Sequence, residues 1–330
     1  PERVESFLEE LSGYTAEPQD REYAMLLARL RQDQPGAERV ESWQNGYLQE
    51  KINAEEFQVD SKEVRQYFNY AATRDGILRL VQDLFGVQFK PWSTETWHPE
   101  VEGYELWDGD QLIGRFFLDM HPREGKFQHA AVAQIRDGIT GQQAPLATLM
   151  CNFPRGDDLM QHSDVVTFLH EFGHLIHYLF AGHHHWSGVS GISTEWDFVE
   201  APSQMLQEWV WDYDTIAQFA KNADGEVIPR ELLDRMTAAR DFGLGMGTRR
   251  QLSLAAMSLG IYNRSPEGLD LKAFTDEMTR KYTRFEPLPE GNFYAAFGHL
   301  NGYSAIYYTY QWSLAIASDM FTRFEQEGLR

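Results

Sequence analysis

Residues 163–182 read SDVVTFLHEFGHLIHYLFAG, and this stretch predicts a long buried helix with two histidines one turn apart. Ser163 offers an N-cap and Asp164 an acid in the first turn. Gly182 follows the apolar run and is suited to end the helix. Gly173 costs about 1 kcal/mol relative to alanine inside a helix, so we expect another element to approach the helix closely there.

Within this helix, residues 170–174 read HEFGH and contain the pattern HExxH. Positions i and i+4 lie on one helical face, so His170 and His174 can bind one Zn²⁺ at roughly 2.0–2.1 Å. Glu171 is then placed to accept a proton from a metal-bound water, as a general base does. The pattern predicts a hydrolase, most often one that cleaves peptide bonds. The alternative is a buried helix with two incidental histidines.

A catalytic zinc site needs a third protein ligand and an open position. His177 would lie about 10 Å along the helix axis from His170, too far for one shared metal. The metzincin pattern requires glycine at position 177 and histidine at position 180, where this sequence has His177 and Phe180. The third ligand must therefore come from outside this helix.

Acidic candidates for the third ligand lie in residues 194–204, TEWDFVEAPSQ, which lead into a largely apolar segment that predicts a second helix. Glu200 is flanked there by valine and alanine. A carboxylate rarely occupies such a setting without a partner, and a zinc ion would satisfy it. Glu195 and Asp197 are alternatives, with helix capping and first-turn charge as their other possible roles.

Tyrosines are concentrated in residues 297–312, FGHLNGYSAIYYTYQW. Tyr303, Tyr307 and Tyr310 are spaced i, i+4 and i+7, which predicts a shared helical face. A phenol can donate a hydrogen bond to a developing oxyanion, and glycines flank His299 in the same block. The alternative is an aromatic helix that packs into the core.

Four segments, in this order along the chain, resemble the thimet oligopeptidase family of zinc metallopeptidases. They are WHPEV at 97–101, FLDMHPREGK at 117–126, HEFGH with the later FVEAPSQ at 170–204, and the tyrosine block at 297–312. The resemblance covers roughly residues 60–320. It implies an oligopeptidase that acts on short peptides, either as an endopeptidase or by releasing C-terminal dipeptides.

The resemblance also implies roles for individual residues. The implied ligands of one Zn²⁺ per chain are His170, His174 and Glu200. The implied general base is Glu171. The implied contacts to the substrate or the tetrahedral oxyanion are His299, Tyr303 and Tyr310.

This sequence departs from the family pattern in two ways. The family has two glycines before the tyrosine that matches Tyr303, whereas this chain has one, so we expect a shorter loop. Family members are also roughly twice as long, with an upstream helical region that forms a channel wall. We therefore expect a truncated catalytic region, and a non-catalytic fragment that binds zinc or peptides is the alternative function.

Length, net charge and cysteine count limit the kinds of partner and cellular compartment that fit this chain. The chain has 330 residues, of which 42% are hydrophobic, so it can bury a large core in one or two domains. Its net charge of −21 argues against nucleic acid and anionic membranes as partners. Cys151 is the single cysteine, so no internal disulfide can form. With no signal-like stretch, these features favour a cytoplasmic protein.

Periodicity predicts the fold class. Helical spacing is found in residues 3–12, 20–33 and 61–85, and a β-hairpin is predicted around Asp108-Gly109, with strands at 104–107 and 112–118. Further strands are expected at 130–135 and 146–151, and mostly helix from residue 163 onward. We expect a mainly α protein with a small β-sheet (α+β) and a zincin-like catalytic core. A helical segment, 1–90, would precede a catalytic region, 91–330.

Several other features have competing interpretations. The glycine-rich residues 243–247 lack phosphate-loop spacing and a preceding strand, which favours a turn or tight helix packing. Cys151 is interpreted as a buried structural thiol. Arg249 and Arg250 are candidates to bind a peptide carboxylate, with a surface ion pair as the alternative. Arg123 and Lys126 are likewise candidates to bind a peptide carboxylate, with a surface ion pair as the alternative.

Overall fold

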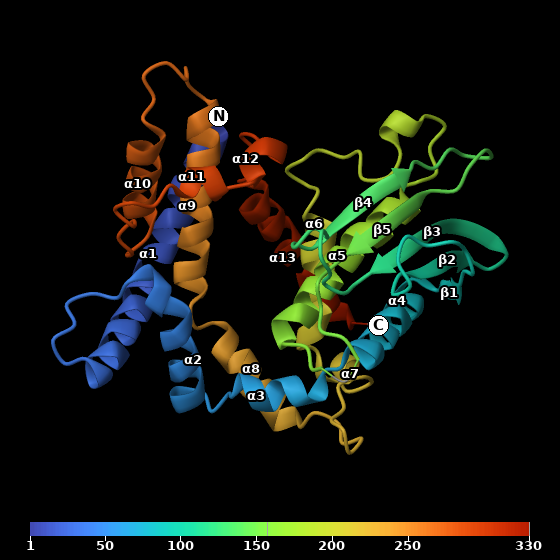
Figure 1. Ribbon diagram of the computed structural model, residues 1–330, viewed down its shortest axis with the longest axis horizontal. Coiled ribbons are helices and arrows are strands. Elements are labelled where there is room, and N and C mark those ends of the chain that lie inside the picture. The colour runs from blue at the N-terminus through green and yellow to red at the C-terminus, as the bar shows by residue number, and fades with distance from the viewer. Residues whose placement is uncertain (157, 330) are drawn as a thin grey trace. The chain divides into compact units, whose positions relative to one another are not determined.

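The computed structural model describes residues 1–156 and 158–329, and the chain forms two compact units (Figure 1). Unit 1 consists of Pro1–Asp60 and Asp234–Trp312, and unit 2 consists of Ser61–Leu233 and Ser313–Arg330. These boundaries differ from the expected division at residue 90. Each unit is discontinuous in sequence because helices from distant parts of the chain pack together.

Unit 1 is helical. Its elements are α1 (Glu2–Asp33), η1 (Ser42–Gln44), α2 (Asn45–Glu56), α9 (Leu244–Tyr262), α10 (Leu271–Tyr282), α11 (Phe293–Ala296) and α12 (His299–Gly302). Helix α8 (Arg230–Arg240) crosses from unit 2 into unit 1, and α13 (Thr309–Glu327) crosses from unit 1 into unit 2.

Helix α1 is one continuous helix, whereas two helices with a break near Gly13 were expected. Its packing against α9 outweighs the weak helix propensity at Gly13 and Pro18. A Cβ atom on Gly245 would lie 2.7 Å from the backbone nitrogen of Gln19, so only glycine permits this approach. The carboxylate of Glu22 accepts the backbone N–H groups of Gly245 and Met246 at 3.0 and 2.8 Å. Tight helix packing at residues 243–247 is therefore confirmed.

Unit 2 contains a five-stranded mixed sheet with the order β1-β2-β3-β5-β4. The strands are β1 (Gln88–Pro91), β2 (Glu102–Asp108), β3 (Gln111–Asp119), β4 (Ala131–Arg136) and β5 (Leu146–Met150). Strands β3 and β5 are parallel and the other neighbours are antiparallel. The expected hairpin is confirmed as β2 and β3, with Gly109 at a φ of 53° in the turn. Strand β1 was not expected.

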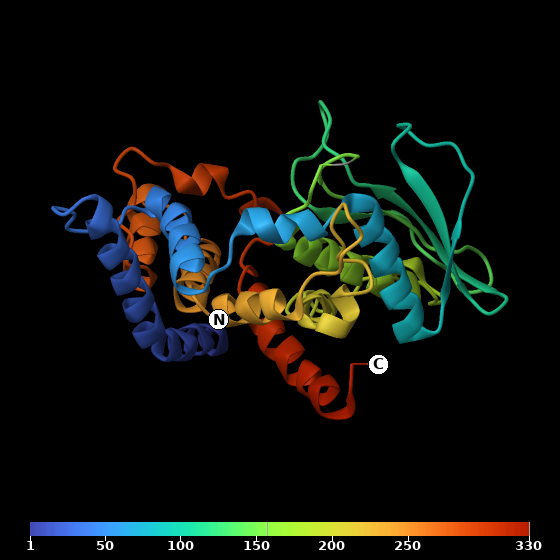
Figure 2. The same cartoon turned by 90° about the horizontal axis from the view of Figure 1, so that it is seen from below.

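Unit 2 also contains several helices, both long and short. They are α3 (Ser61–Val64), η2 (Arg65–Tyr67), α4 (Tyr70–Phe85), α5 (His162–Phe180), η3 (Ser187–Val189), α6 (Ala201–Leu206), η4 (Gln207–Trp211) and α7 (Tyr213–Ile216). Helix α5 lies against the sheet, where the Phe172 ring contacts those of Phe89 and Phe116 with centroids 5.7 and 6.1 Å apart. Helix α4 lies beside α5 (Figure 2), and the rings of Tyr70 and Phe168 stack between them. The expected mainly α fold with a small sheet is confirmed.

The turn after β3 is held by a buried carboxylate. Asp119 is 3% exposed and accepts two hydrogen bonds from Arg123, at 2.6 and 2.7 Å, and one from Trp97 Nε1 at 2.9 Å. The ammonium group of Lys126 lies 3.0 Å from the same carboxylate. Burial works against ionisation, but these donors outweigh it and keep the pKa of Asp119 well below its usual range. Arg123 and Lys126 therefore have a structural role in this turn.

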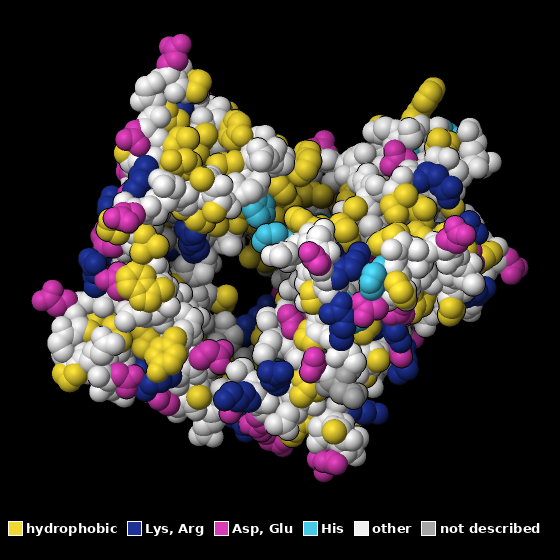
Figure 3. All heavy atoms as spheres, viewed as in Figure 1, with side chains coloured by type: hydrophobic (Ala, Val, Ile, Leu, Met, Phe, Trp, Pro, Cys, Tyr) yellow, Lys and Arg dark blue, Asp and Glu magenta, His cyan; other side chains and the backbone are white. Residues whose placement is uncertain are grey.

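The distribution of charge, the apolar character of the helices and the burial of the single cysteine complete the description. On the face shown in Figure 3, acidic side chains are spread over both units and are interspersed with Lys and Arg. None of the helices in the described part of the chain combines the length and apolar character needed to cross a bilayer. The thiol of Cys151 is buried, as expected, and burial raises its pKa well above the ordinary value.

Candidate metal centre

Helix α5 presents its two histidines on the face that the sheet does not cover. Its N-cap is Gln161 rather than the expected Ser163, and Asp164 completes a capping box by accepting the Gln161 backbone N–H at 2.8 Å. Most apolar residues of α5 are buried, whereas the side chains of His170 and His174 are 20% and 12% exposed. The helix therefore positions both imidazoles at the edge of a packed core.

Gly173 allows α6 to approach α5 closely, as the sequence predicted. A Cβ atom at this position would lie 2.6 Å from Ser203 Cα and 3.3 Å from the Pro202 carbonyl oxygen. Such distances leave no room for a larger side chain. Glu200 is the N-cap residue of α6, so this contact brings its carboxylate to the two histidines.

Three donor atoms converge at this point. Glu200 Oε2 lies 3.1 Å from His170 Nε2 and 3.0 Å from His174 Nε2, and the group is compact enough for one metal ion. A tetrahedral zinc with bonds of 2.0–2.2 Å separates its ligand atoms by about 3.3 Å, so the observed spacing fits zinc. Glu200 is only 2% exposed, which a carboxylate tolerates when cations surround it.

The charges in this group stabilise one another. Burial opposes ionisation of Glu200, but hydrogen bonds from His170 and His174 outweigh it and hold the pKa of Glu200 well below its usual value. Burial likewise disfavours a charged His170 ring, yet the Glu200 carboxylate raises the pKa of His170. For Glu171 burial is the largest influence, and it raises the pKa of that carboxyl despite the neighbouring histidines. Glu171 is thus a stronger base than an exposed glutamate.

Gln207 orients the first histidine, and the sequence analysis missed it. Its Oε1 lies 3.0 Å from His170 Nδ1, where it can accept the Nδ1–H of the neutral ring, and in that tautomer Nε2 carries the lone pair that binds a metal. The sequence distance between Glu200 and Gln207 could have indicated this role. Gln207 follows Glu200 by seven residues, and two helical turns return the chain to the same face.

The other acidic and histidine candidates lie outside this group of donor atoms. Glu195 is exposed, and the backbone carbonyl of Asp197 accepts the Ser313 hydroxyl at 2.9 Å. His177 is one turn beyond His174, and burial lowers its pKa. Of the candidates considered for the third ligand, the structure brings Glu200 to the two histidines.

The tyrosine block forms a second group of side chains, within unit 1. The ring of His299 packs against those of Tyr303, Tyr307 and Tyr310, with centroids 5.3, 5.0 and 5.8 Å away. Tyr310 Oη lies 3.3 Å from His299 Nε2. The shared helix predicted for the three tyrosines is wrong, because the chain leaves helical geometry after α12 and Ser304 has a φ of +50°. The turn nevertheless gathers the rings around His299.

Known proteins resemble this chain over its whole length. The model of peptidase family M3 matches residues 1–330. The chain is 32% identical to oligopeptidase A of Escherichia coli (strain K12) over 346 aligned positions, which cover 100% of this chain and 50% of that protein. It is 32% identical to the thimet-like oligopeptidase of Dictyostelium discoideum over 305 positions, covering 87% of this chain and 45% of that protein.

A solved structure shares the fold. It is titled "PZ peptidase A with inhibitor 2", and it superimposes with a TM-score of 0.54 at 12% identity over 99% of this chain and 49% of that one. The chain thus spans about half the length of the curated relatives and of this structure.

Proposed function

Because the chain belongs to peptidase family M3, we propose that it hydrolyses peptide bonds in short peptides with one zinc ion held by His170, His174 and Glu200. The observation that carries this proposal is the convergence of three donor atoms beside Glu171. Among common side-chain groups, two imidazoles and one carboxylate are a donor set typical of catalytic zinc, which leaves a position for the reactants.

Each residue of the site has a defined task. Zinc, when bound, would polarise the scissile carbonyl and lower the pKa of a coordinated water molecule. Glu171 accepts the proton of the attacking water and then delivers it to the leaving amine. Its raised pKa suits both steps, because the carboxylate holds a proton more readily than an exposed glutamate does. Gln207 keeps His170 in the tautomer that binds metal.

The histidine and tyrosine group completes the proposal. His299 and Tyr310 hold the developing oxyanion, and Tyr303 contacts the substrate. The support is chemical, since an imidazole and a phenol can each donate a hydrogen bond to an oxyanion, and these two lie 3.3 Å apart, within hydrogen-bond distance of each other. The rings of Tyr303 and Tyr310 stack with centroids 5.4 Å apart, so the substrate contact and the donor group would be positioned together.

Elemental analysis and mass spectrometry of a digested peptide library test this function together. The wild-type chain should carry stoichiometric zinc and cleave peptides, and the library will show whether it acts internally or releases C-terminal dipeptides. Glu171→Gln should retain zinc and lose nearly all turnover. Glu195→Gln removes an exposed glutamate near the site in sequence and should retain both. Equal turnover by Glu171→Gln and wild type would refute the assignment of the base.

A second candidate is a zinc- and peptide-binding protein without catalysis. It is favoured by one fact, namely that the chain spans about half the length of its curated relatives. In that case the wild-type chain would hold zinc and bind peptides, and the library would remain intact with the wild type and with Glu171→Gln alike.

A further inference from the structure

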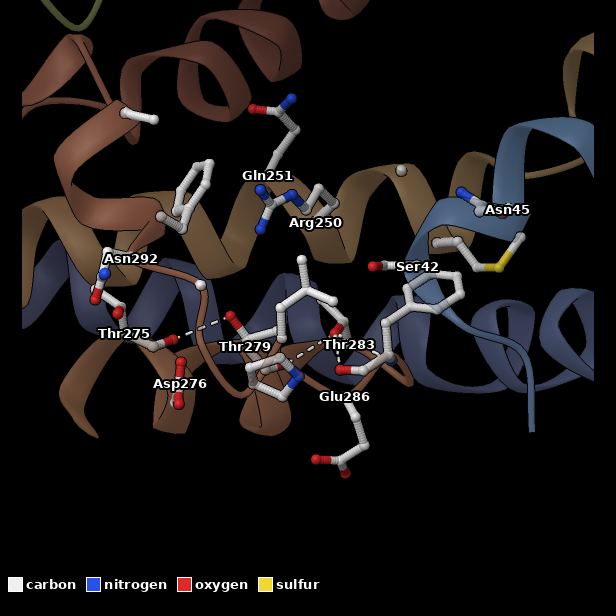
Figure 4. A pocket seen from close by; sticks show the side chains of 18 of the residues that line it. Ser42, Asn45, Arg250, Gln251, Thr275, Asp276, Thr279, Thr283, Glu286 and Asn292 are labelled. Atoms are coloured by element: carbon white, nitrogen blue, oxygen red, sulfur yellow. Dashed lines mark hydrogen bonds between the residues drawn. The ribbon is translucent and has the colours of Figure 1, made fainter. Parts of the chain in front are cut away.

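A cavity lies within unit 1. Its volume is about 690 Å³, in the range that small-molecule sites occupy. Helix α9 forms one wall and α10 another, and the remaining walls come from the start of α2 and from residues 285–296. Figure 4 shows Arg250 and Gln251 extending from α9, the hydroxyls of Thr275 and Thr279 from α10, and that of Thr283 from the residue that follows α10.

Among the described residues, Arg250 is the one cationic residue that lines this cavity. In the described part of the chain it forms no ion pair and no hydrogen bond, and its guanidinium lies 4.7 Å from the centre of the Phe293 ring. Burial lowers the pKa of the Arg250 guanidinium. The surface ion pair considered from the sequence is therefore wrong. A charged group in this position favours an anion.

The acids that line the cavity do not compensate Arg250, because each is paired elsewhere. Asp276 binds Lys272 at 2.7 Å, and Glu286 binds Arg280 at 3.0 Å. The threonines are also engaged, since Thr275 and Thr279 donate their hydroxyl hydrogens to backbone carbonyls one turn earlier in α10. Arg250 thus remains as a strong donor for a ligand.

Gln251 supplies the complementary group. Its Oε1 is buried and has no hydrogen-bond partner among the described residues, which is costly unless a donor arrives. Phe285 and Phe293 add apolar surface to the same cavity. The lining therefore offers a guanidinium for a carboxylate, an amide oxygen for an N–H donor, and aromatic rings for an apolar side chain.

We propose that this cavity binds the C-terminal end of a short peptide or an N-acylated amino acid, with the α-carboxylate on Arg250 and the amide N–H on Gln251. These three chemical features occur together in such a ligand. The residues that line this cavity belong to unit 1, whereas the three zinc-binding donor atoms belong to unit 2. If this cavity does not bind such a ligand, the proposed zinc chemistry is unaffected.

Isothermal titration calorimetry with N-acetylphenylalanine and its uncharged amide tests the proposal. The acid should bind saturably to the wild-type chain at least tenfold more tightly than the amide, because a charge-assisted hydrogen bond is lost in the amide. Arg250→Gln should remove that preference, and Arg250→Lys should retain part of it. Arg264→Gln is a matched control, since Arg264 also lies over a ring, that of Phe274, but does not line the cavity.

His174→Ala separates this site from the zinc site, where a carboxylate could also bind. The proposed binding should persist in His174→Ala and be lost in Arg250→Gln, with circular dichroism showing that both variants are folded. Gln251→Leu should weaken the acid and the amide alike, because both carry the N–H. The proposal is overturned if the acid does not bind, if acid and amide bind equally, or if binding follows His174 rather than Arg250.

Discussion

The Cα of Ser203 lies so close to Gly173 that a Cβ atom there would be 2.6 Å away. This contact joins the helix that carries the two histidines to the helix that begins at Glu200. A methyl group at position 173 must push α6 outward, and the Glu200 carboxylate would move with it. The geometry of the donor group thus depends on a residue that binds nothing itself.

Gly173→Ala is therefore expected to destabilise unit 2 by about 1–3 kcal/mol and to weaken zinc binding, since overpacking displaces the backbone. Urea unfolding and competition with a chromogenic chelator measure the two effects. Gly13→Ala is the control, because Gly13 is inside α1 and a Cβ atom added there would meet nothing within 4 Å. That substitution should stabilise the protein by about 0.5–1 kcal/mol. Equal effects at both positions would contradict this account.

Gln207→Ala should weaken zinc binding by about 10–100-fold, because the partner that fixes the His170 tautomer is lost. Chelator competition gives the affinity directly, without any need for turnover. Gln207→Glu, which retains an acceptor for Nδ1–H, should bind zinc at least as well as wild type. Gln142→Ala removes an exposed glutamine and should leave the affinity unchanged. An unaltered affinity in Gln207→Ala would show that the hydrogen bond has no role in metal binding.

Tyr310→Phe should lower kcat by about 10²–10³-fold with a smaller change in KM, if its hydroxyl stabilises the oxyanion. The reason is that a donor to a developing charge acts on the transition state rather than on the bound peptide. Steady-state kinetics on a peptide found in the library screen separates kcat from KM. Tyr14→Phe is the control, because Tyr14 is an exposed tyrosine on α1. A change confined to KM would instead indicate a role in substrate binding alone.

Asp119→Asn should destabilise the protein by about 3–5 kcal/mol at pH 7, because Arg123 and Lys126 would lose a buried partner. The folded-state pKa of Asp119 is depressed, so its contribution is fully present above the unfolded pKa of about 4 and is lost as pH falls below it. The difference between wild type and variant should therefore shrink between pH 5 and the acid limit in urea titrations.

Asp20→Asn is the matched control for that experiment. Asp20 pairs with Arg284 with both side chains half exposed, so its loss should cost no more than about 1 kcal/mol. A difference for Asp119→Asn that stays constant down to acid pH would show that its charge does not contribute to stability.

Much of the metal centre follows from local spacing. The i, i+4 relation places His170 and His174 on one face of any helix that forms here, and the apolar neighbours of Glu200 make it a candidate partner beside Glu195 and Asp197. The β2–β3 hairpin follows for a similar reason, since its turn sequence and its alternating residues are both local. The close approach of another element at Gly173 could also be predicted, because glycine in a helix interior lowers helix stability and a close packing contact explains its presence there.

Other features could not be predicted because they depend on residues far apart in the chain. The continuity of α1 past Gly13 depends on Gly245 and Glu22, which meet only after folding. The tyrosines of the 297–312 block were assigned to one helix, and the positive φ at Ser304 prevents it. The unpaired charge of Arg250 is visible only when the nearby acids are seen to bind other cations.

The sequence by itself determined which side chains carry the chemistry, because a helix repeats every 3.6 residues and converts spacing into direction. It also determined the mainly α fold class with a small sheet. Only the tertiary structure decided which acid meets the histidines, which amide orients them, and how the chain divides into two units. Those outcomes depend on close packing between distant segments, and such packing is set by the shapes of side chains across the interface rather than by neighbours in sequence.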